Sequence, residues 1–303
     1  MMRGVPPRPA AIMNRRQLFQ SLPALAAATQ IQAQAASRCL LRTGLVAYSF
    51  RKQMEAKSMT YDALIRYVAD LGLDGLDTTV YWFPDTSDRF LASLRAAAYR
   101  NAVSLYSIAV RVQLCQPTPE LQRAEVEKVA KWLEVAEKVG AGHIRVFGGT
   151  VPKGASQEQA IGWAVEVLKR AAEHAAAKGV RLGVEDAGGL TTTAEPTVEI
   201  VKRADSPFVG INVDTGNFPK DGYAQVALCV PYAVNVHFKE RIAGVGGGQE
   251  KADWDRLIGL FAKAGYRGYI SLEYEDKEPP ETAVPRLAAE LRNAVRKVSG
   301  DGK

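Results

Sequence analysis

One pattern occurs four times between residues 180 and 273: VRLGVE (180–185), VGINVD (209–214), AVNVH (233–237) and YISLE (269–273). Each copy is a short apolar run that ends at a side chain able to bind a metal, namely Glu185, Asp214, His237 and Glu273. Each gap between copies is long enough for a loop and a helix. Apolar runs of this kind, separated by helical spans, predict parallel strands joined by crossover helices.

The rest of the chain repeats the same alternation. Further strands are expected at 44–50, 75–78, 103–108 and 143–147. Helices are expected at 60–71 (capped by Thr60), 91–99, 117–139, 157–177, 195–204, 223–230, 254–264 and 282–298. Eight strand–helix units without a linker predict an α/β fold, a (β/α)8 TIM barrel forming a single domain over residues 37–303, in which the strand ends share one face. A doubly wound open sheet is the alternative, but its strand order reverses and would bring fewer strand ends to one ligand.

The first 36 residues are expected to be a targeting segment rather than part of the fold. They contain paired arginines in NRRQLF (14–19), a short apolar stretch (22–28) and AQA (33–35). This order is typical of a twin-arginine export signal, with Met13 as an alternative start, and predicts a periplasmic protein. A disordered basic tail is the competing interpretation. The apolar stretch is too short for a permanent membrane anchor.

The net charge and the cysteines argue against a nucleic-acid-binding protein and against a lipoprotein. Much of the net charge of +6 comes from the targeting segment, which carries Arg3, Arg8, Arg15 and Arg16 and no acidic residue. The charge therefore gives little support for nucleic-acid binding. Cys39 follows Arg38 where a lipoprotein would need a small residue. Cys115 and Cys229 are expected to be buried and unpaired.

The four strand-end residues predict a metal centre. Three carboxylates and one imidazole favour Mn²⁺, Mg²⁺ or Co²⁺ over a structural zinc ion, which prefers cysteine and histidine. Four protein ligands leave two octahedral positions for two substrate oxygens, and a metal there would polarise a carbonyl so that the adjacent carbon loses a proton. Glu185 and Glu273 can then act as the acid and base around an enediolate as well as ligands, whereas Asp214 and His237 would be ligands only.

These residues resemble the xylose isomerase-like barrel superfamily, the sugar phosphate isomerase/epimerase group. The matching segments are GLDGLD (72–77), GVED (183–186), NVDTGN (212–217), VHFK (236–239) and SLE (271–273), and the resemblance spans residues 43–298. It implies that the four strand-end positions bind a divalent metal and that the two glutamates transfer protons. Two positions depart from the family: Asp186-Ala187 replaces the Asn-His of many relatives, and Asn217 replaces a histidine of the ketose 3-epimerases.

The function expected from this site is isomerisation or epimerisation of a sugar or keto-sugar. The same proton abstraction can begin a dehydration, so a dehydratase or lyase acting on a keto-sugar or keto-polyol is the second expectation. An exported carbohydrate-binding barrel without turnover is the alternative from another class, because the fold alone does not choose an activity. The DNA-repair enzymes of this fold need more histidines than His143, His174 and His237.

Other residues are expected to contact a carbohydrate substrate. Asn217, Lys239 and Arg241 lie in loops beside the metal ligands, and Tyr48 and Trp82 follow the first two strands, where they can form an apolar wall for a sugar ring. The glycines at 244 and 246–248 indicate a flexible lid rather than a phosphate cradle, since no Lys-Ser/Thr follows them. Homo-oligomerisation is left open.

Overall fold

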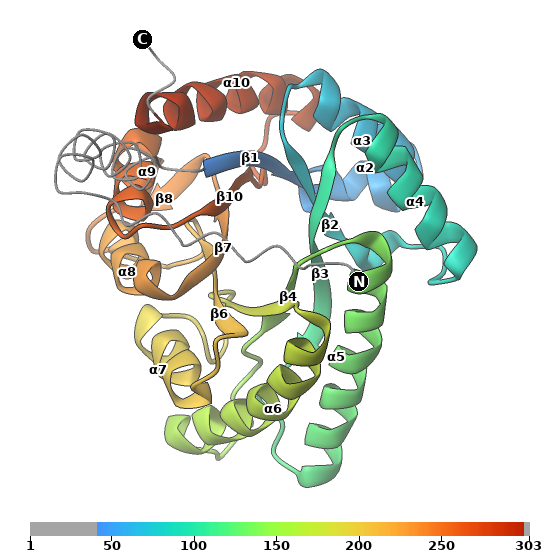
Figure 1. Ribbon diagram of the computed structural model, residues 1–303. Helices are drawn as coiled ribbons and strands as arrows, with labels where there is room; N and C mark the ends of the chain where they lie inside the picture. Colours follow the sequence, from blue (N-terminus) through green and yellow to red (C-terminus); the bar gives the residue numbers. More distant parts are fainter. Residues whose placement is uncertain (1–40, 300–303) are drawn as a thin grey trace, which may run out of the picture. The chain divides into compact units, whose positions relative to one another are not determined.

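The computed structural model describes residues 41–299, and the proposed targeting segment and Cys39 lie outside this range. The described chain forms a closed barrel of eight parallel strands surrounded by helices (Figure 1). The strands are β1 (Leu41–Val46), β2 (Gly75–Thr79), β3 (Ser104–Gln113), β4 (His143–Phe147), β5 (Arg181–Glu185), β6 (Val209–Asp214), β7 (Ala233–Phe238) and β10 (Gly268–Leu272). Neighbours in sequence are neighbours in the barrel, and β10 closes it against β1. The predicted TIM barrel is confirmed.

The helices that cover the barrel follow the predicted alternation. They are α2 (Arg51–Glu55), α3 (Tyr61–Asp70), α4 (Asp88–Arg100), α5 (Pro119–Val139), α6 (Gln157–Lys178), α7 (Ala194–Ala204), α8 (Gly222–Cys229), α9 (Trp254–Lys263) and α10 (Pro280–Ser299). Thr60 caps α3 by accepting a hydrogen bond from the amide of Ala63, as predicted, and Thr118 caps α5 in the same way through Leu121. Such caps satisfy amides that have no partner inside the helix.

The lower layer of the barrel interior is packed from large side chains that face glycines. A Cβ at Gly183 would collide with the imidazole of His143, and one at Gly75 would meet the rings of Tyr106 and Tyr269. These two tyrosine rings stack with their centroids 3.7 Å apart. His143 donates or accepts a hydrogen bond with Ser107 at 2.8 Å. This layer fills the base of the barrel, so ligands must enter from the opposite end, where the strands finish.

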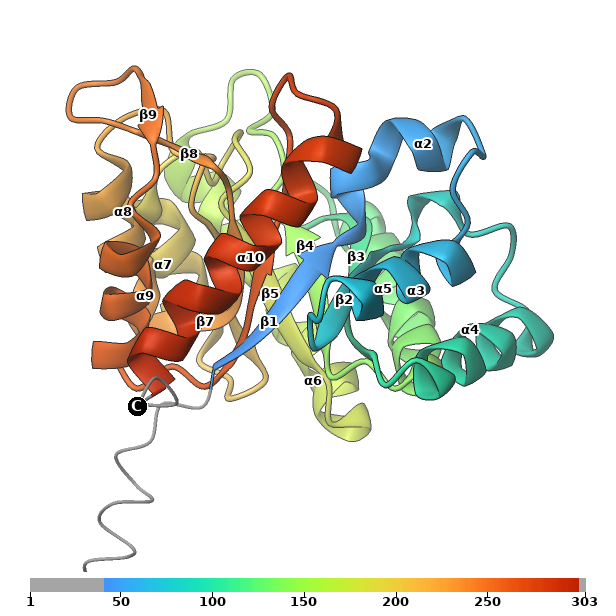
Figure 2. The same ribbon diagram turned by 90° about the horizontal axis from the view of Figure 1, so that it is seen from above.

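Several segments differ from the sequence expectation: α2 was not predicted, and β3 runs to Gln113 whereas the predicted strand ended at residue 108. The first strand ends at Val46, and residues 47–50 form a 3₁₀ helix, η1 (Ala47–Phe50), because Ser49 turns inward and its hydroxyl accepts a hydrogen bond from the amide of Tyr274 at 2.9 Å. The glycine-rich segment after β7 is a two-stranded hairpin, β8 (Arg241–Ala243) and β9 (Gln249–Lys251). Figure 2 shows this hairpin and α2 at the same end of the barrel.

Two further findings concern the cysteines and the search for membrane-spanning helices. Cys115 and Cys229 are buried and free. Among the described residues, no helix is both long enough and apolar enough to span a bilayer.

Candidate metal centre

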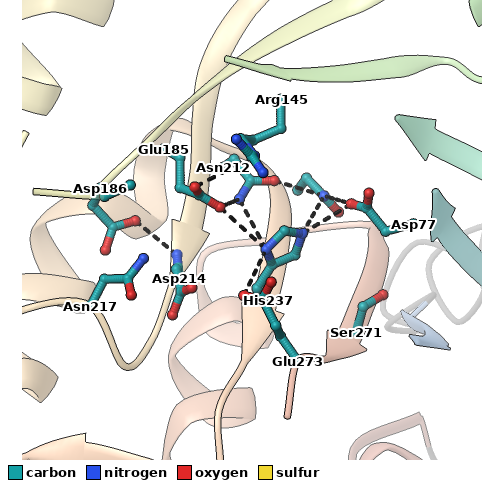
Figure 3. Close-up of polar contacts among 12 residues, drawn as sticks. Asp77, Arg145, Glu185, Asp186, Asn212, Asp214, Asn217, His237, Ser271 and Glu273 are labelled. Carbon is teal, nitrogen blue, oxygen red and sulfur yellow. Dashed lines mark hydrogen bonds and ion pairs between the residues drawn. The ribbon is translucent and has the colours of Figure 1, made fainter. Parts of the chain in front are cut away.

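The four predicted ligands converge at one end of the barrel. Glu185 and Asp214 are the last residues of β5 and β6, His237 lies near the end of β7, and Glu273 follows β10. Ligand atoms of Glu185, Asp214 and His237 all lie within 4.8 Å of one another. His237 Nδ1 is 3.4 Å from Glu185 Oε1 and 3.4 Å from Glu273 Oε2 (Figure 3). Because the carboxyl ends of parallel strands share one face, this convergence follows from the strand register.

The imidazole of His237 is held from its far side. Its Nε2 lies 2.9 Å from Oδ2 of Asp77, the middle residue of β2. The amide of Asn235 donates to the same Asp77 oxygen at 2.9 Å and to Asn212 Oδ1 at 2.8 Å. With Nε2–H donating to Asp77, Nδ1 is the ring nitrogen that faces Glu185 and Glu273. A carboxylate behind a histidine in this way fixes the tautomer of a metal ligand.

Neighbouring charges outweigh burial in setting the pKa values of His237 and Glu273. Burial alone lowers the pKa of His237, but the carboxylates of Glu273 and Asp77 outweigh it and raise that pKa well above its ordinary value. Burial raises the pKa of Glu273, yet the charges of Lys239 and His237 hold it well below its usual range. Glu273 is therefore ionised at neutral pH, whereas His237 binds a proton that any metal must displace.

The donor set fits a hard or borderline divalent cation. It offers three buried carboxylates and one ring nitrogen without a cysteine, which matches Mn²⁺, Mg²⁺ or Co²⁺ better than a structural zinc ion. Asp214 Oδ2 is buried, accepts no well-aligned hydrogen bond and lies 3.1 Å from the Lys239 ammonium, so this carboxylate oxygen already faces a cation. The residues that would hold the ion are Glu185, Asp214, His237 and Glu273.

The predicted substrate-binding residues divide into three groups. Tyr48 and Trp82 stack with ring centroids 6.1 Å apart and form a half-buried aromatic wall with Tyr81. Lys239 points toward the carboxylates and donates to Asn217 Oδ1 at 3.3 Å. Arg241 does not join them, because its guanidinium donates to the carbonyl of Gln249 at 2.8 Å and its side chain is 47% exposed.

A family model described as xylose isomerase-like TIM barrel matches residues 65–294. The chain belongs to this xylose isomerase-like TIM barrel family. No curated protein sequence matches it.

Solved structures share the fold of this xylose isomerase-like barrel at low sequence identity. D-psicose 3-epimerase from Clostridium cellulolyticum H10, solved with D-tagatose, has a TM-score of 0.69 and 19% identity over 85% of this chain and 98% of its own. The probable 3-DHS dehydratase AsbF from Bacillus anthracis has a TM-score of 0.62 and 17% identity over 84% and 98%. The IOLI protein with a bound zinc atom has a TM-score of 0.65 and 14% identity over 86% and 98%.

Sequence reasoning missed several residues at the centre of this xylose isomerase-like barrel. Asp77, Asn212 and Asn235 form the polar network behind His237. A signal for two of them was present: Asn212 and Asn235 each stand two residues before a ligand, and residues two apart on a strand face the same side. Polar residues on the inward face of an apolar strand require a partner inside the barrel.

Arg145 and Asp186 also border the centre. The Arg145 side chain, only 6% exposed, places Nε 3.4 Å from Glu185 Oε2 and donates to the Tyr81 hydroxyl at 3.1 Å. Asp186 accepts the backbone amide of Asp214 at 2.8 Å. Burial, helped by the charge of Asp214, raises the pKa of Asp186 well above its ordinary value.

Proposed function

We propose that the protein is a divalent-metal-dependent isomerase or epimerase of a sugar or keto-sugar. The observation that carries this proposal is the position of Glu185 and Glu273, which approach the same imidazole nitrogen at 3.4 Å from two non-adjacent strands. Two carboxylates on separate supports can act on two sides of one reacting carbon or on neighbouring carbons. Removal and return of a proton at carbon requires such a pair.

The side chains of the centre have separate tasks in this reaction. A bound metal would draw electron density from a substrate carbonyl and so acidify the neighbouring C–H bond. Glu273 is suited to remove that proton, because its carboxylate lies beside the other predicted ligands, 3.4 Å from His237 Nδ1. Glu185 is suited to return it, and its orientation is fixed by Asn212, which donates to Oε1 at 3.1 Å. Return to the same carbon from the other side gives an epimer, and return to the neighbouring carbon gives an isomer.

Similarity to known proteins and the aromatic wall support a small carbohydrate as substrate. The chain shares its fold with a D-psicose 3-epimerase, and the wall of Tyr48 and Trp82 offers apolar faces on which a sugar ring can stack. The N-terminal segment adds a location to the proposal: a twin-arginine signal would export the protein after folding, which favours an unphosphorylated sugar.

A dehydratase is the second candidate, and Asp186 is the observation that favours it. Loss of water needs an acid that protonates the departing hydroxyl, and burial together with the charge of Asp214 raises the pKa of Asp186, which favours the protonated carboxyl. The similar fold of the probable dehydratase AsbF is compatible with this chemistry.

Proton exchange in D₂O tests both candidates. The Mn²⁺-loaded protein is incubated with a panel of keto-sugars and the products are followed by NMR and mass spectrometry. An epimerase or isomerase introduces deuterium at carbon and changes the configuration or position of the carbonyl without loss of water. Loss of water establishes the dehydratase instead, and binding without exchange at any carbon refutes both in favour of a carbohydrate-binding barrel.

A further inference from the structure

Lys239 places its ammonium group between two of the predicted ligands and the carboxylate of Glu275. Its Nζ lies 3.1 Å from Asp214 Oδ2 and 3.5 Å from Glu273 Oε2. It also lies 2.6 Å from Glu275 Oε1. Two of the four ligands therefore already face a fixed positive charge.

The backbone and stem of Lys239 are held in place. Its amide donates to Thr215 Oγ1 at 3.1 Å, and its carbonyl accepts the indole N–H of Trp254 at 3.0 Å. The stem runs over Gly216, where an added Cβ would come within 2.8 Å of it. Only the ammonium end of the Lys239 side chain can therefore change its carboxylate partner.

The oxygens around that ammonium differ in their access to solvent. The side chains of Asp214 and Glu273 are 1% and 7% exposed, whereas that of Glu275 is 34% exposed. Lys239 thus has two inner carboxylate partners, which are predicted metal ligands, and one outer carboxylate partner at the rim, which is not; its ammonium also donates to Asn217 Oδ1 at 3.3 Å.

An ammonium and a divalent cation cannot share the inner carboxylates without strong repulsion, because both are positive and the site is largely screened from water. We propose that Lys239 is a resident cation of the metal centre: it neutralises Asp214 and Glu273 when no ion is bound, and when a divalent ion enters it withdraws from these two carboxylates and keeps its contact with Glu275. This inference rests on the proposed metal centre. It gives Lys239 control over metal affinity instead of the substrate contact that its position in the sequence suggests.

Titration calorimetry with Mn²⁺ alone tests the proposal on the full chain. Lys239→Met keeps the length of the stem and removes the charge, so it should lower the Kd for Mn²⁺ about tenfold or more. Lys239→Arg keeps the charge and should remain close to wild type. The matched control is Arg241→Met, which removes a neighbouring charge whose guanidinium binds the Gln249 carbonyl, and it should change the Kd less than about twofold.

A second measurement uses the unmodified protein, so it does not depend on a variant that folds. Acetylation of Lys239 by a water-soluble reagent, read by mass spectrometry, should become faster when Mn²⁺ is added, because the amine moves outward. Lys297, which pairs with Asp255 on the surface, is the internal reference and should not change.

The outcomes separate this proposal from the metal centre itself. If the wild type binds Mn²⁺ and Lys239→Met binds it no more tightly, or if labelling of Lys239 does not respond to Mn²⁺, Lys239 is not a resident cation. An equal gain in Arg241→Met also overturns it, because the effect would then be general charge. If neither the wild type nor Lys239→Met binds Mn²⁺, the proposed metal centre is wrong as well.

Discussion

Two buried histidines in the same barrel have opposite surroundings. His143 opens β4 at the base of the interior, where its Nδ1 pairs with the Ser107 hydroxyl and its Nε2 has no hydrogen-bond partner. His237 lies near the end of β7, between Asp77 on one side and two glutamates on the other. Burial lowers the pKa of His143 to about 3, whereas the carboxylates raise the pKa of His237 well above its ordinary value.

The difference shows how one interior serves two purposes. The lower layer consists of neutral groups fitted against glycines, and it stabilises the closed barrel by packing. The upper layer concentrates charge, which costs desolvation energy and is maintained because each charge has an opposite partner. A barrel of this kind separates stability at its base from chemistry at its carboxyl end.

The largest effect is expected from removing a charge in the upper layer. Glu273→Gln keeps the shape of the side chain but cannot take a proton, so proton exchange at carbon should fall by about 10²–10⁴-fold. NMR in D₂O measures the loss, and the thermal midpoint of the Mn²⁺-free variant shows that the fold persists. Exchange at the wild-type rate would remove Glu273 from the mechanism.

A smaller effect is expected behind the upper histidine. Asp77→Asn exchanges a carboxylate for an amide and weakens the hold on Nε2 of His237, so the Kd for Mn²⁺ should rise about 10–100-fold. Calorimetry measures it, with Asp74→Asn as control, because Asp74 lies just before β2 and binds Thr43. Unchanged affinity in Asp77→Asn would show that the imidazole needs no support from β2.

The lower histidine is expected to affect stability with pH. His143 is neutral when folded and takes up a proton on unfolding below its ordinary pKa of 6.5. Its contribution to the free energy of unfolding is therefore complete above that pH and is lost as the pH falls toward about 3, by at most about 1.4 kcal/mol per pH unit. Urea unfolding at a series of pH values should show a flatter dependence for His143→Gln than for wild type, and parallel curves would contradict the assignment.

The smallest effect is expected at the aromatic wall. Trp82→Ala removes one face available to a sugar ring and should raise KM by about threefold to tenfold with little change in kcat. Phe83→Leu is the control, because Phe83 packs away from the centre against Tyr61 and Phe90. If both variants raise KM equally, the wall does not contact the substrate.

The sequence was sufficient for the features that depend on local pattern. The apolar runs located all eight strands, and the convergence of the four predicted ligands followed because parallel strands place their carboxyl ends together. The end of the first strand was predicted wrongly, because the aromatic residues of Tyr48-Ser49-Phe50 are typical of a strand. The turn at this point depends on a hydrogen bond between Ser49 and Tyr274, which is far away in the sequence.

The features that sequence could not supply depend on contacts between distant strands. Asp77 lies in a segment that resembles the family, but its role appears only when β2 and β7 face each other across the barrel. Arg145 has no local mark that distinguishes it from a surface arginine, although its side chain is buried. Lys239 was placed near the site correctly, but the direction of its ammonium depends on Asp214 and Glu273.

The hydrogen bond between Asp77 and His237 joins strand β2 to strand β7. The imidazole of His237 is oriented only after the early strand β2 and the late strand β7 have packed into the same barrel. A partly folded chain therefore contains the predicted ligands without their arrangement. We therefore expect the barrel to fold before it binds a metal ion, so that tight metal binding reports a closed barrel.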